Sequence, residues 1–471
     1  MGFVVGTDFY NARVIVEPLS SPLSSPLPPE EALLRLAAWP HVALLDSSRA
    51  GDPQSRWSFL TADPVSVQTI AGVADPATLG LPRPLVAPAN APPFCGGLVG
   101  CLSYDYGRRL ERLDAPAVDE FALPVAVVGE YDFAVAWNHA TGECILAAET
   151  RSRADAVREQ LRQTPSPQVW TRPDPVDIAT PQHPVAGAAG VTSNFSRAAY
   201  LDAVEAMRAA IGRGDIFQAN LAQRLLAPAT CDPLDLYRRL RRHSPAPMAA
   251  YFDAGPYRLL STSPERFLQI NAGRIETRPI KGTWRRLPRP EADLFTRDAL
   301  LESEKDRAEN VMIVDLMRND LSRVCRDGSM RVPSLCQVET YENVQHLVSV
   351  VTAELADGLT PLDVLDAVFP GGSITGCPKI EAMNRITQLE GVARGPYCGS
   401  LFYWGHAREG HGLDGEPGSA FDASILIRTV IDAGGWWQLP VGGGITWDSR
   451  PAAEHQETLD KATAMLAAIA D

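Results

Sequence analysis

Apolar residues recur along the chain with two periods, one typical of helices and one typical of strands. Tyr200, Val204, Met207 and Ile211 fall on one side of a helix, and Ser196 stands before them in the position of an N-cap. This pattern predicts a helix that begins after Ser196 and ends at the glycines that follow the stripe.

A second helical stripe consists of Ile313, Met317 and Leu321, which recur every four residues and predict a partly buried helix. Short β-like runs dominate the N-terminal half instead. These runs are residues 42–45, 125–128 and 134–137. The first half of the chain is therefore predicted to be rich in strands and poor in helices.

A proline-rich segment, residues 163–194, interrupts both periods and predicts a linker. It separates a β-rich N-terminal region, residues 1–162, from a C-terminal region, residues 195–471. Strands and helices come in blocks rather than in strict alternation, so the sequence favours an α+β fold over a doubly wound one.

Residues 267–270 and 274–280 flank an Asn-Ala-Gly turn, which predicts a β-hairpin, and Lys281 follows just past the predicted strand end. A lysine amine has an ordinary pKa of roughly 10.4, so it acts as a nucleophile only where burial or cationic neighbours lower that pKa. The candidate cationic neighbours are Arg278, Arg285 and Arg286. An ordinary surface lysine is the alternative interpretation.

Two glycine-rich segments also carry candidate chemistry. Residues 370–379 form a loop that can present backbone N–H groups to an anion, and a helical run, residues 380–389, follows it. The loop lacks the Lys-Ser/Thr ending of a nucleotide-binding loop, which disfavours phosphate transfer. Residues 442–444 are three glycines ahead of a helix on which Glu454 and Glu457 share a face. A solvated helix face is the alternative for this pair.

Composition narrows the classes of function. The chain has 471 residues, of which 45% are apolar, enough to bury a large core. Its 57 acidic and 43 basic residues give a net charge of −14, which argues against nucleic acid or an anionic membrane as a partner. Neither a signal peptide nor a membrane span is recognisable, so we expect a cytoplasmic protein. The eight cysteines show no Cys-x-x-Cys pair, and we expect free thiols.

The motifs together resemble those of the chorismate-utilising enzymes. The resemblance rests on Ser-Pro-Glu-Arg-Phe at residues 263–267, Pro-Ile-Lys-Gly-Thr at residues 279–283, both glycine segments and the Glu-x-x-Glu pair. Within the family the chain is most similar to the aminodeoxychorismate synthase component I branch, because anthranilate synthases have alanine in place of the lysine. The resemblance implies a large composite α+β fold of antiparallel β-sheets packed face to face, with helices outside. It also implies that residues 195–471 form the chorismate-binding catalytic region.

The resemblance also implies roles for individual residues. Glu265 resembles the general acid/base, and Lys281 resembles the nucleophile that adds to the substrate ring. Glu309 and Glu457 resemble Mg²⁺ ligands, with Glu454 close by and acting through water. A surface ion pair on its helix is the alternative for Glu309.

Chorismate carries two carboxylates, so guanidinium groups and backbone N–H donors are the expected partners. The residues that the resemblance assigns to substrate binding are Gln218, His346, Gly372, Ser373, Thr375, Tyr397, Arg428, Gly442, Gly443, Gly444 and Lys461. Gln218 favours a branch that uses an amine, because isochorismate and salicylate synthases resemble one another in having a lysine there.

Relatives also resemble one another in a tryptophan pocket. The residues of this chain that correspond to it are Ser47, Gln54, Ser55, Arg56, Trp57, Pro247, Met248 and Ala249. The serines match, but Met248 and Ala249 depart from the usual aromatic and hydroxyl pair, so plain core packing is the alternative.

The resemblance implies conversion of chorismate and ammonia to 4-amino-4-deoxychorismate, on the way to 4-aminobenzoate and folate. The rivals are an anthranilate synthase component I and a catalytically inert regulatory protein that binds chorismate or tryptophan. No cysteine lies in a Gly-x-Cys-x-Gly elbow, so ammonia is expected from a separate glutaminase of the PabA type.

Overall fold

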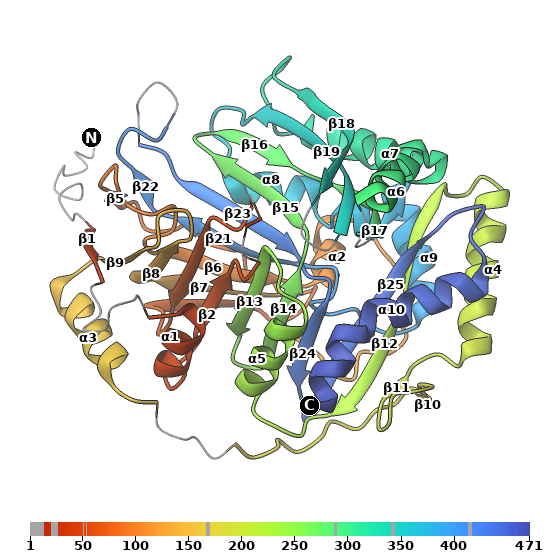
Figure 1. Cartoon of the computed structure of the whole chain (residues 1–471), viewed down its shortest axis with the longest axis horizontal. Coiled ribbons are helices and arrows are strands. Elements are labelled where there is room, and N and C mark those ends of the chain that lie inside the picture. Colours follow the sequence, from red (N-terminus) through yellow and green to blue (C-terminus); the bar gives the residue numbers. More distant parts are fainter. Residues whose placement is uncertain are drawn as a thin grey trace.

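Two large antiparallel β-sheets dominate the protein, which we describe from a computed structural model (Figure 1). A small parallel pair, β5 (Val86–Ala87) and β22 (Ala407–Arg408), lies apart from them. The structure describes residues 14–19, 27–49, 51–52, 54–165, 170–286, 290–340, 344–412 and 417–471.

The first sheet combines strands from both halves of the chain. In spatial order its described strands are β1 (Ile15–Pro18), β9 (Glu143–Ala148), β8 (Phe133–Asn138), β3 (Trp57–Thr61), β2 (Ala43–Asp46), β13 (Met248–Asp253), β14 (Arg258–Ser263), β24 (Thr429–Ala433), β25 (Trp436–Ile445), β12 (Gln218–Pro228), β11 (Thr192–Ser193) and β10 (His183–Pro184), with β20 (Gly376–Cys377) paired to β12. The two halves meet where β2 pairs with β13, and there Asp46 lies opposite Ala249.

The second sheet is built in the same mixed way. Its described strands, in spatial order, are β17 (Ile280–Arg285), β19 (Val344–Glu354), β16 (Arg274–Thr277), β15 (Arg266–Asn271), β23 (Ala420–Ile425), β21 (Ser400–Gly405), β6 (Gly97–Leu102), β7 (Ala126–Tyr131) and β4 (Ser66–Ile70), with β18 (Arg331–Thr340) paired to β19. The strands on either side of residues 163–194 therefore share both sheets, and this segment contributes β10 and β11 itself.

Helices surround the sheets. The described helices are α1 (Pro29–Leu36), α2 (Gly107–Leu110), α3 (Arg151–Arg162), α4 (Arg197–Gly212), α5 (Pro233–His243), α6 (Pro290–Glu302), α7 (Glu304–Leu321), α8 (Pro361–Val368), α9 (Lys379–Glu390) and α10 (Pro451–Ala470), with 3₁₀ turns η2 (Tyr104–Tyr106) and η3 (Gly372–Ile374). The hydroxyl of Ser196 accepts a hydrogen bond from the Ala199 N–H at 3.1 Å, which confirms the predicted cap of α4. The stripe of Ile313, Met317 and Leu321 is buried on α7, as predicted.

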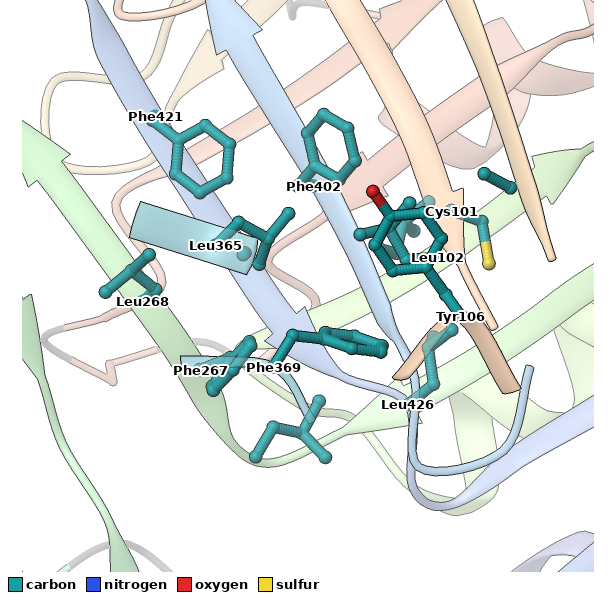
Figure 2. Packing of buried hydrophobic residues seen from close by; sticks show 14 of the residues in the cluster. Cys101, Leu102, Tyr106, Phe267, Leu268, Leu365, Phe369, Phe402, Phe421 and Leu426 are labelled. Atoms are coloured by element: carbon teal, nitrogen blue, oxygen red, sulfur yellow. The ribbon is translucent and has the colours of Figure 1, made fainter. Parts of the chain in front are cut away.

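The two sheets pack face to face, and the helices cover their outer sides. Phe59 of β3 meets Tyr403 of β21 with ring centroids 5.3 Å apart, which joins the two sheets. Phe402, the residue before Tyr403, points the other way, because side chains alternate along a strand. Figure 2 shows its ring beside Phe421 and Leu365 of α8. The predicted arrangement of the sheets is therefore confirmed.

The outer side of the first sheet is covered by α1, α3, α5 and α10. Leu33, Val157, Leu240 and Met465 belong to one buried cluster with strands of that sheet. None of the described helices combines the length and the apolar composition needed to cross a lipid bilayer.

The predicted hairpin is confirmed in β15 and β16. Ala272 and Gly273 form its turn with φ of 53° and 72°, the left-handed values that a two-residue turn of this kind requires. The prediction of one strand over residues 274–280 is wrong, because β16 ends at Thr277 and β17 begins at Ile280. Pro279 stands between them and has no N–H to continue the ladder.

Candidate active site

A cavity of about 530 Å³ lies where β12, β17, β19, β25, α7 and α10 meet the glycine-rich loop around η3. Its volume is in the range of sites for small ligands. The sequence-predicted residues that line it are Glu265, Lys281, Glu309, His346, Ser373, Tyr397, Arg428, Gly442, Gly444, Glu457 and Lys461. The fold thus gathers most of the predicted site from segments that are far apart in the sequence.

Glu265 lies between β14 and β15 and is 6% exposed. The Ser263 hydroxyl fixes this turn, since it donates to the Ile425 carbonyl at 2.6 Å and accepts from the Glu265 N–H at 3.3 Å. Burial raises the pKa of Glu265, against the opposing effects of Lys281 and of hydrogen bonds from the Ser373 side chain and the Ile280 N–H. The raised pKa favours the protonated form that a general acid needs.

Lys281 is the second residue of β17, so the prediction that it lies past a strand end is wrong. Its Nζ donates to the Ser373 carbonyl oxygen at 3.1 Å. Burial lowers the pKa of Lys281 and Lys461 lowers it further, while Glu309 and Glu265 raise it. The ammonium group therefore lies in an environment that favours release of its proton.

Two of the three arginines that the sequence suggested as neighbours of Lys281 form ion pairs with other residues. Arg278 pairs with Glu339, and Arg286 pairs with Asp293 at 2.9 Å, while the side chain of Arg285 lies outside the described residues. Lys461 takes the role instead, because α10 brings its ammonium group to the cavity from 180 residues away.

Gly282 allows the irregular backbone conformation that follows Lys281. Its φ is +71°, and the pairing of β17 with β19 shifts register between Lys281 and Thr283. A Cβ at this position would lie 2.9 Å from Leu300 Cδ1, so a side chain is excluded both by conformation and by space. The resulting bulge directs the lysine toward the cavity.

The predicted metal ligands divide into two settings. Glu309 on α7 and Glu457 on α10 line the cavity, and Glu457 pairs with Lys461 at 2.7 Å. Glu454 is 5% exposed, lies outside the lining and accepts a hydrogen bond from the Ser449 hydroxyl at 2.6 Å. Within the described residues, no group of three or more His, Cys, Asp or Glu side chains is arranged to hold a metal ion. The two lining carboxylates could supply only part of a coordination shell.

Glycines form the part of the wall that faces these carboxylates. A Cβ at Gly443 would lie 3.4 Å from Glu457 Oε1, and one at Gly444 would lie 2.5 Å from Gln218 Nε2. Gln218 is buried behind Gly444, and its Oε1 has no hydrogen-bond partner in the described part of the chain. The Lys461 ammonium donates to the Gly442 carbonyl at 2.8 Å. The wall is therefore bare backbone, and a side chain at Gly444 would displace Gln218, whereas a Cβ at Gly443 would make only an ordinary contact.

The glycine-rich loop, the region between β23 and β24 and strand β19 supply the remaining predicted groups. Gly372 and Thr375 lie just behind the lining, where Thr375 donates to the Gly371 carbonyl at 3.0 Å. Burial lowers the pKa of Arg428, and no carboxylate of the described residues lies within ion-pair distance of its guanidinium. Burial, with Arg49 and Arg428, lowers the pKa of His346 to about 4, so its imidazole is neutral near pH 7.

Three polar lining residues were missed from the sequence, Asn220, Asp306 and Asp460. A signal existed for each. Asn220 is two residues after Gln218 on the same strand. Asp306 is three residues before Glu309 on α7, and Asp460 is three residues after Glu457 on α10, so each shares a face with a residue that had been selected.

A second cavity, of about 320 Å³, lies between β2, β13, β15, β21 and β23. The predicted tryptophan-pocket residues that line it are Ser47, Gln54, Arg56, Trp57, Pro247, Met248 and Ala249. Ser55 lies outside the lining, and its buried hydroxyl has no partner among the described residues. Arg266 and Asp422 also line this cavity and form an ion pair at 2.8 Å.

The chain is similar to known proteins over most of its length. The family described as "chorismate binding enzyme" matches residues 51–467. Aminodeoxychorismate synthase component 1 of Klebsiella aerogenes is 38% identical over 454 residues, which cover 92% of this chain and 94% of that protein. Anthranilate synthase component 1 of Thermus thermophilus is 39% identical over 391 residues, covering 82% and 80%.

The fold is also found among solved structures. The crystal structure of anthranilate synthase component I from Streptococcus pneumoniae matches with a TM-score of 0.69 and 28% identity, covering 88% of this chain and 93% of that chain. With most of its length matched in sequence and structure alike, the chain belongs to the family of chorismate binding enzymes.

Proposed function

We propose that this chain is an aminodeoxychorismate synthase component 1, which converts chorismate and ammonia to 4-amino-4-deoxychorismate. The observation that carries the proposal is the position of the Lys281 amine beside Glu265. Both contact Ser373, since Lys281 donates to its carbonyl and Glu265 accepts from its hydroxyl. The lowered pKa of the amine and the raised pKa of the carboxyl suit a nucleophile and an acid in one site.

The proposed reaction has two displacements. The neutral amine of Lys281 bonds to ring carbon 2, the ring double bonds shift, and the 4-hydroxyl leaves as water with a proton from Glu265. Ammonia then bonds to carbon 4, the double bonds shift back, and the bond between carbon 2 and the Lys281 nitrogen breaks. Arg428, Tyr397 and the glycine-rich loop are proposed to bind the two substrate carboxylates.

Mg²⁺ is the proposed cofactor, with Glu309 and Glu457 as its protein ligands. The donor set fits, because Mg²⁺ takes hard oxygen ligands, keeps several waters and often uses one or two carboxylates. When bound it would supply positive charge beside a substrate carboxylate. Glu454 is proposed to act on the ion through water.

A separate glutaminase of the PabA type is the proposed source of ammonia. The name "component 1" of the relatives supports a partner component. All eight cysteines are free thiols, which supports the cytoplasm as the location. For the second cavity we propose L-tryptophan, supported by the predicted residues that surround it.

Anthranilate synthase component 1 is the nearest rival, since such a relative is as similar in identity. Lys281 favours the first assignment, because anthranilate synthases resemble one another in having alanine there. An inert regulatory binder is disfavoured, since the acid, the amine and both carboxylates line one cavity.

Product analysis by liquid chromatography and mass spectrometry tests the proposal. The pure chain is incubated with chorismate, Mg²⁺ and excess ammonium, with and without an aminodeoxychorismate lyase. We expect 4-aminobenzoate only when the lyase is present. Formation of 2-aminobenzoate without the lyase would establish the rival, and absence of any product after addition of the glutaminase would establish the inert binder.

A further inference from the structure

Arg394 is buried behind the catalytic cavity and is not among its lining residues. Its guanidinium donates to both carboxylate oxygens of Glu390 at 2.7 and 2.9 Å, to the Ile374 carbonyl at 3.1 Å and to the Asn220 carbonyl at 2.6 Å. Glu390 Oε1 also accepts the N–H of Ala222 at 2.7 Å. We call the pair of Arg394 and Glu390 the buried brace. It ties the end of α9 to β12 and to the glycine-rich loop.

The tied loop carries the contacts to the reacting groups. Ile374, which the brace holds by its carbonyl, follows Ser373 in the 3₁₀ turn η3. Ser373 in turn accepts from the Lys281 amine with its carbonyl and donates to Glu265 with its hydroxyl. Only one residue separates the brace from both contacts.

The brace also holds an aromatic ring of the cavity. The Arg394 guanidinium lies 4.6 Å from the ring centroid of Tyr104 and 5.7 Å from that of Tyr397, which lines the cavity. A planar fork can donate in its plane while its face contacts a ring, which a lysine ammonium cannot do.

We propose that Arg394, held by Glu390, is a positioning residue that fixes Ser373 where it orients Lys281 and Glu265. This role rests on the proposed function of that site. Bonds form only when the reacting atoms are held close and aligned, so a loop displaced by about 1 Å slows the reaction on the order of 10²-fold.

The chain contains a matched control for this brace. Arg224 belongs to β12, the strand that the brace contacts. It pairs with Glu120 at 2.9 Å, and these side chains are 5% and 2% exposed. The corresponding values for Arg394 and Glu390 are 2.7 Å, 4% and 3%. Neither Arg224 nor Glu120 lines the catalytic cavity. The two pairs are thus alike in charge and burial and differ in their link to the loop.

The test compares the double variants Arg394→Gln/Glu390→Gln and Arg224→Gln/Glu120→Gln in the full chain. Each removes both charges, so no buried charge is left unpaired. With chorismate, Mg²⁺ and ammonium, we expect kcat/KM to fall about 10- to 100-fold for the brace variant and less than about twofold for the control. Ser373→Ala removes the hydroxyl that contacts Glu265 and keeps the carbonyl that Lys281 contacts. In this background the effect of the brace variant should be smaller than in the wild type, because coupled sites are not additive.

A measurement that needs no turnover accompanies the assay. Hydrogen exchange of peptides covering residues 371–377 should become at least about tenfold faster in the brace variant and stay unchanged in the control. Arg394→Lys serves if the double variant does not fold, since it keeps the charge but not the fork. It should show the same faster exchange and a fall in kcat/KM of at least about fivefold.

Several results would overturn the inference: equal activities of the brace and control variants, additivity with Ser373→Ala, or unchanged exchange of the loop. If the wild-type chain does not turn over chorismate, the proposed function fails. The exchange measurement then decides by itself whether Arg394 holds the loop.

Discussion

Two consecutive residues of the chain line different cavities, the catalytic cavity and the second cavity. Glu265 lines the first, and the next residue, Arg266, lines the second. Neighbouring side chains of extended backbone point in opposite directions, so one segment at the start of β15 serves both cavities.

The two cavities differ in whether an arginine of the lining has an ion-pair partner within the protein. In the second cavity, Arg266 pairs with Asp422 at 2.8 Å and Asp46 accepts from Arg241 at 2.6 Å. In the catalytic cavity, Lys281 donates to a neutral carbonyl, and Arg428 has no ion-pair partner in the described part of the chain. Arg428 can therefore pair with an anionic ligand, whereas Arg266 and Asp422 are already paired with each other.

The largest effect should come from the amine that distinguishes the catalytic cavity. Lys281→Ala should lower formation of aminodeoxychorismate on the order of 10³-fold or more, because the proposed nucleophile is lost, and some product should divert to anthranilate. Chromatography with mass detection measures both products. Aminodeoxychorismate formation at the wild-type rate would contradict the covalent role.

The buried imidazole of the catalytic cavity should make stability depend on pH. His346 has a folded-state pKa of about 4 and an ordinary value of about 6.5. Above pH 6.5 it is neutral in both states; as pH falls, the unfolded chain takes the proton first, so stability is lost down to about pH 4. Wild type should thus lose about 3 kcal/mol more than His346→Gln between pH 7 and pH 4.

Urea unfolding at a series of pH values measures this difference. Other buried acids titrate in the same range, so only the gap between the two proteins is informative. Parallel stability curves for wild type and His346→Gln would contradict the prediction.

The carboxylates of the catalytic cavity should control the demand for Mg²⁺. Glu309→Gln and Glu457→Gln should each raise the Mg²⁺ concentration for half-maximal activity at least about tenfold, because each removes a proposed charged oxygen ligand. Asp460→Asn is the control, since Asp460 lines the same cavity on the same helix as Glu457. Equal shifts in all three variants would point to a general effect of charge.

The smallest effect on turnover should come from filling the second cavity. Ala249→Leu places a larger side chain in its lining. It should abolish the rise in melting temperature that we expect from L-tryptophan, while kcat changes less than about twofold. Thermal unfolding with and without tryptophan measures it. A wild-type protein that does not respond to tryptophan would support plain core packing instead.

Local pattern predicted helices well and strand ends poorly. Helices α4 and α7 follow from apolar stripes and an N-cap, which depend on residues close in sequence. The strand that holds Lys281 could not be located this way, because β17 is defined by pairing with β19, in which Lys281 lies opposite Leu347. The cationic neighbour of Lys281 was predicted wrongly for the same reason, because Lys461 is close to it only in the folded chain.

Resemblance to a family supplied most of the candidate site, where periodicity could not. Glu265, Lys281 and Glu457 stand in different motifs, and nothing in the spacing of those motifs shows that they meet in one cavity. Asn220 and Asp306 could have been predicted from the spacing of residues on one face of a strand or helix. Arg394 was not, since its importance lies in backbone carbonyls that it meets only after folding.

The sequence by itself determined the kinds of chemistry present, including an amine, a carboxylic acid, glycine loops and the helices that carry acidic pairs. Only the tertiary structure decided which of these meet, which way burial moves the pKa of Lys281 and Glu265, and which arginine holds the loop. The physical reason is the sequence distance over which each interaction acts. Helix periodicity and caps act over a few residues, whereas desolvation and strand pairing depend on contacts between residues hundreds of positions apart.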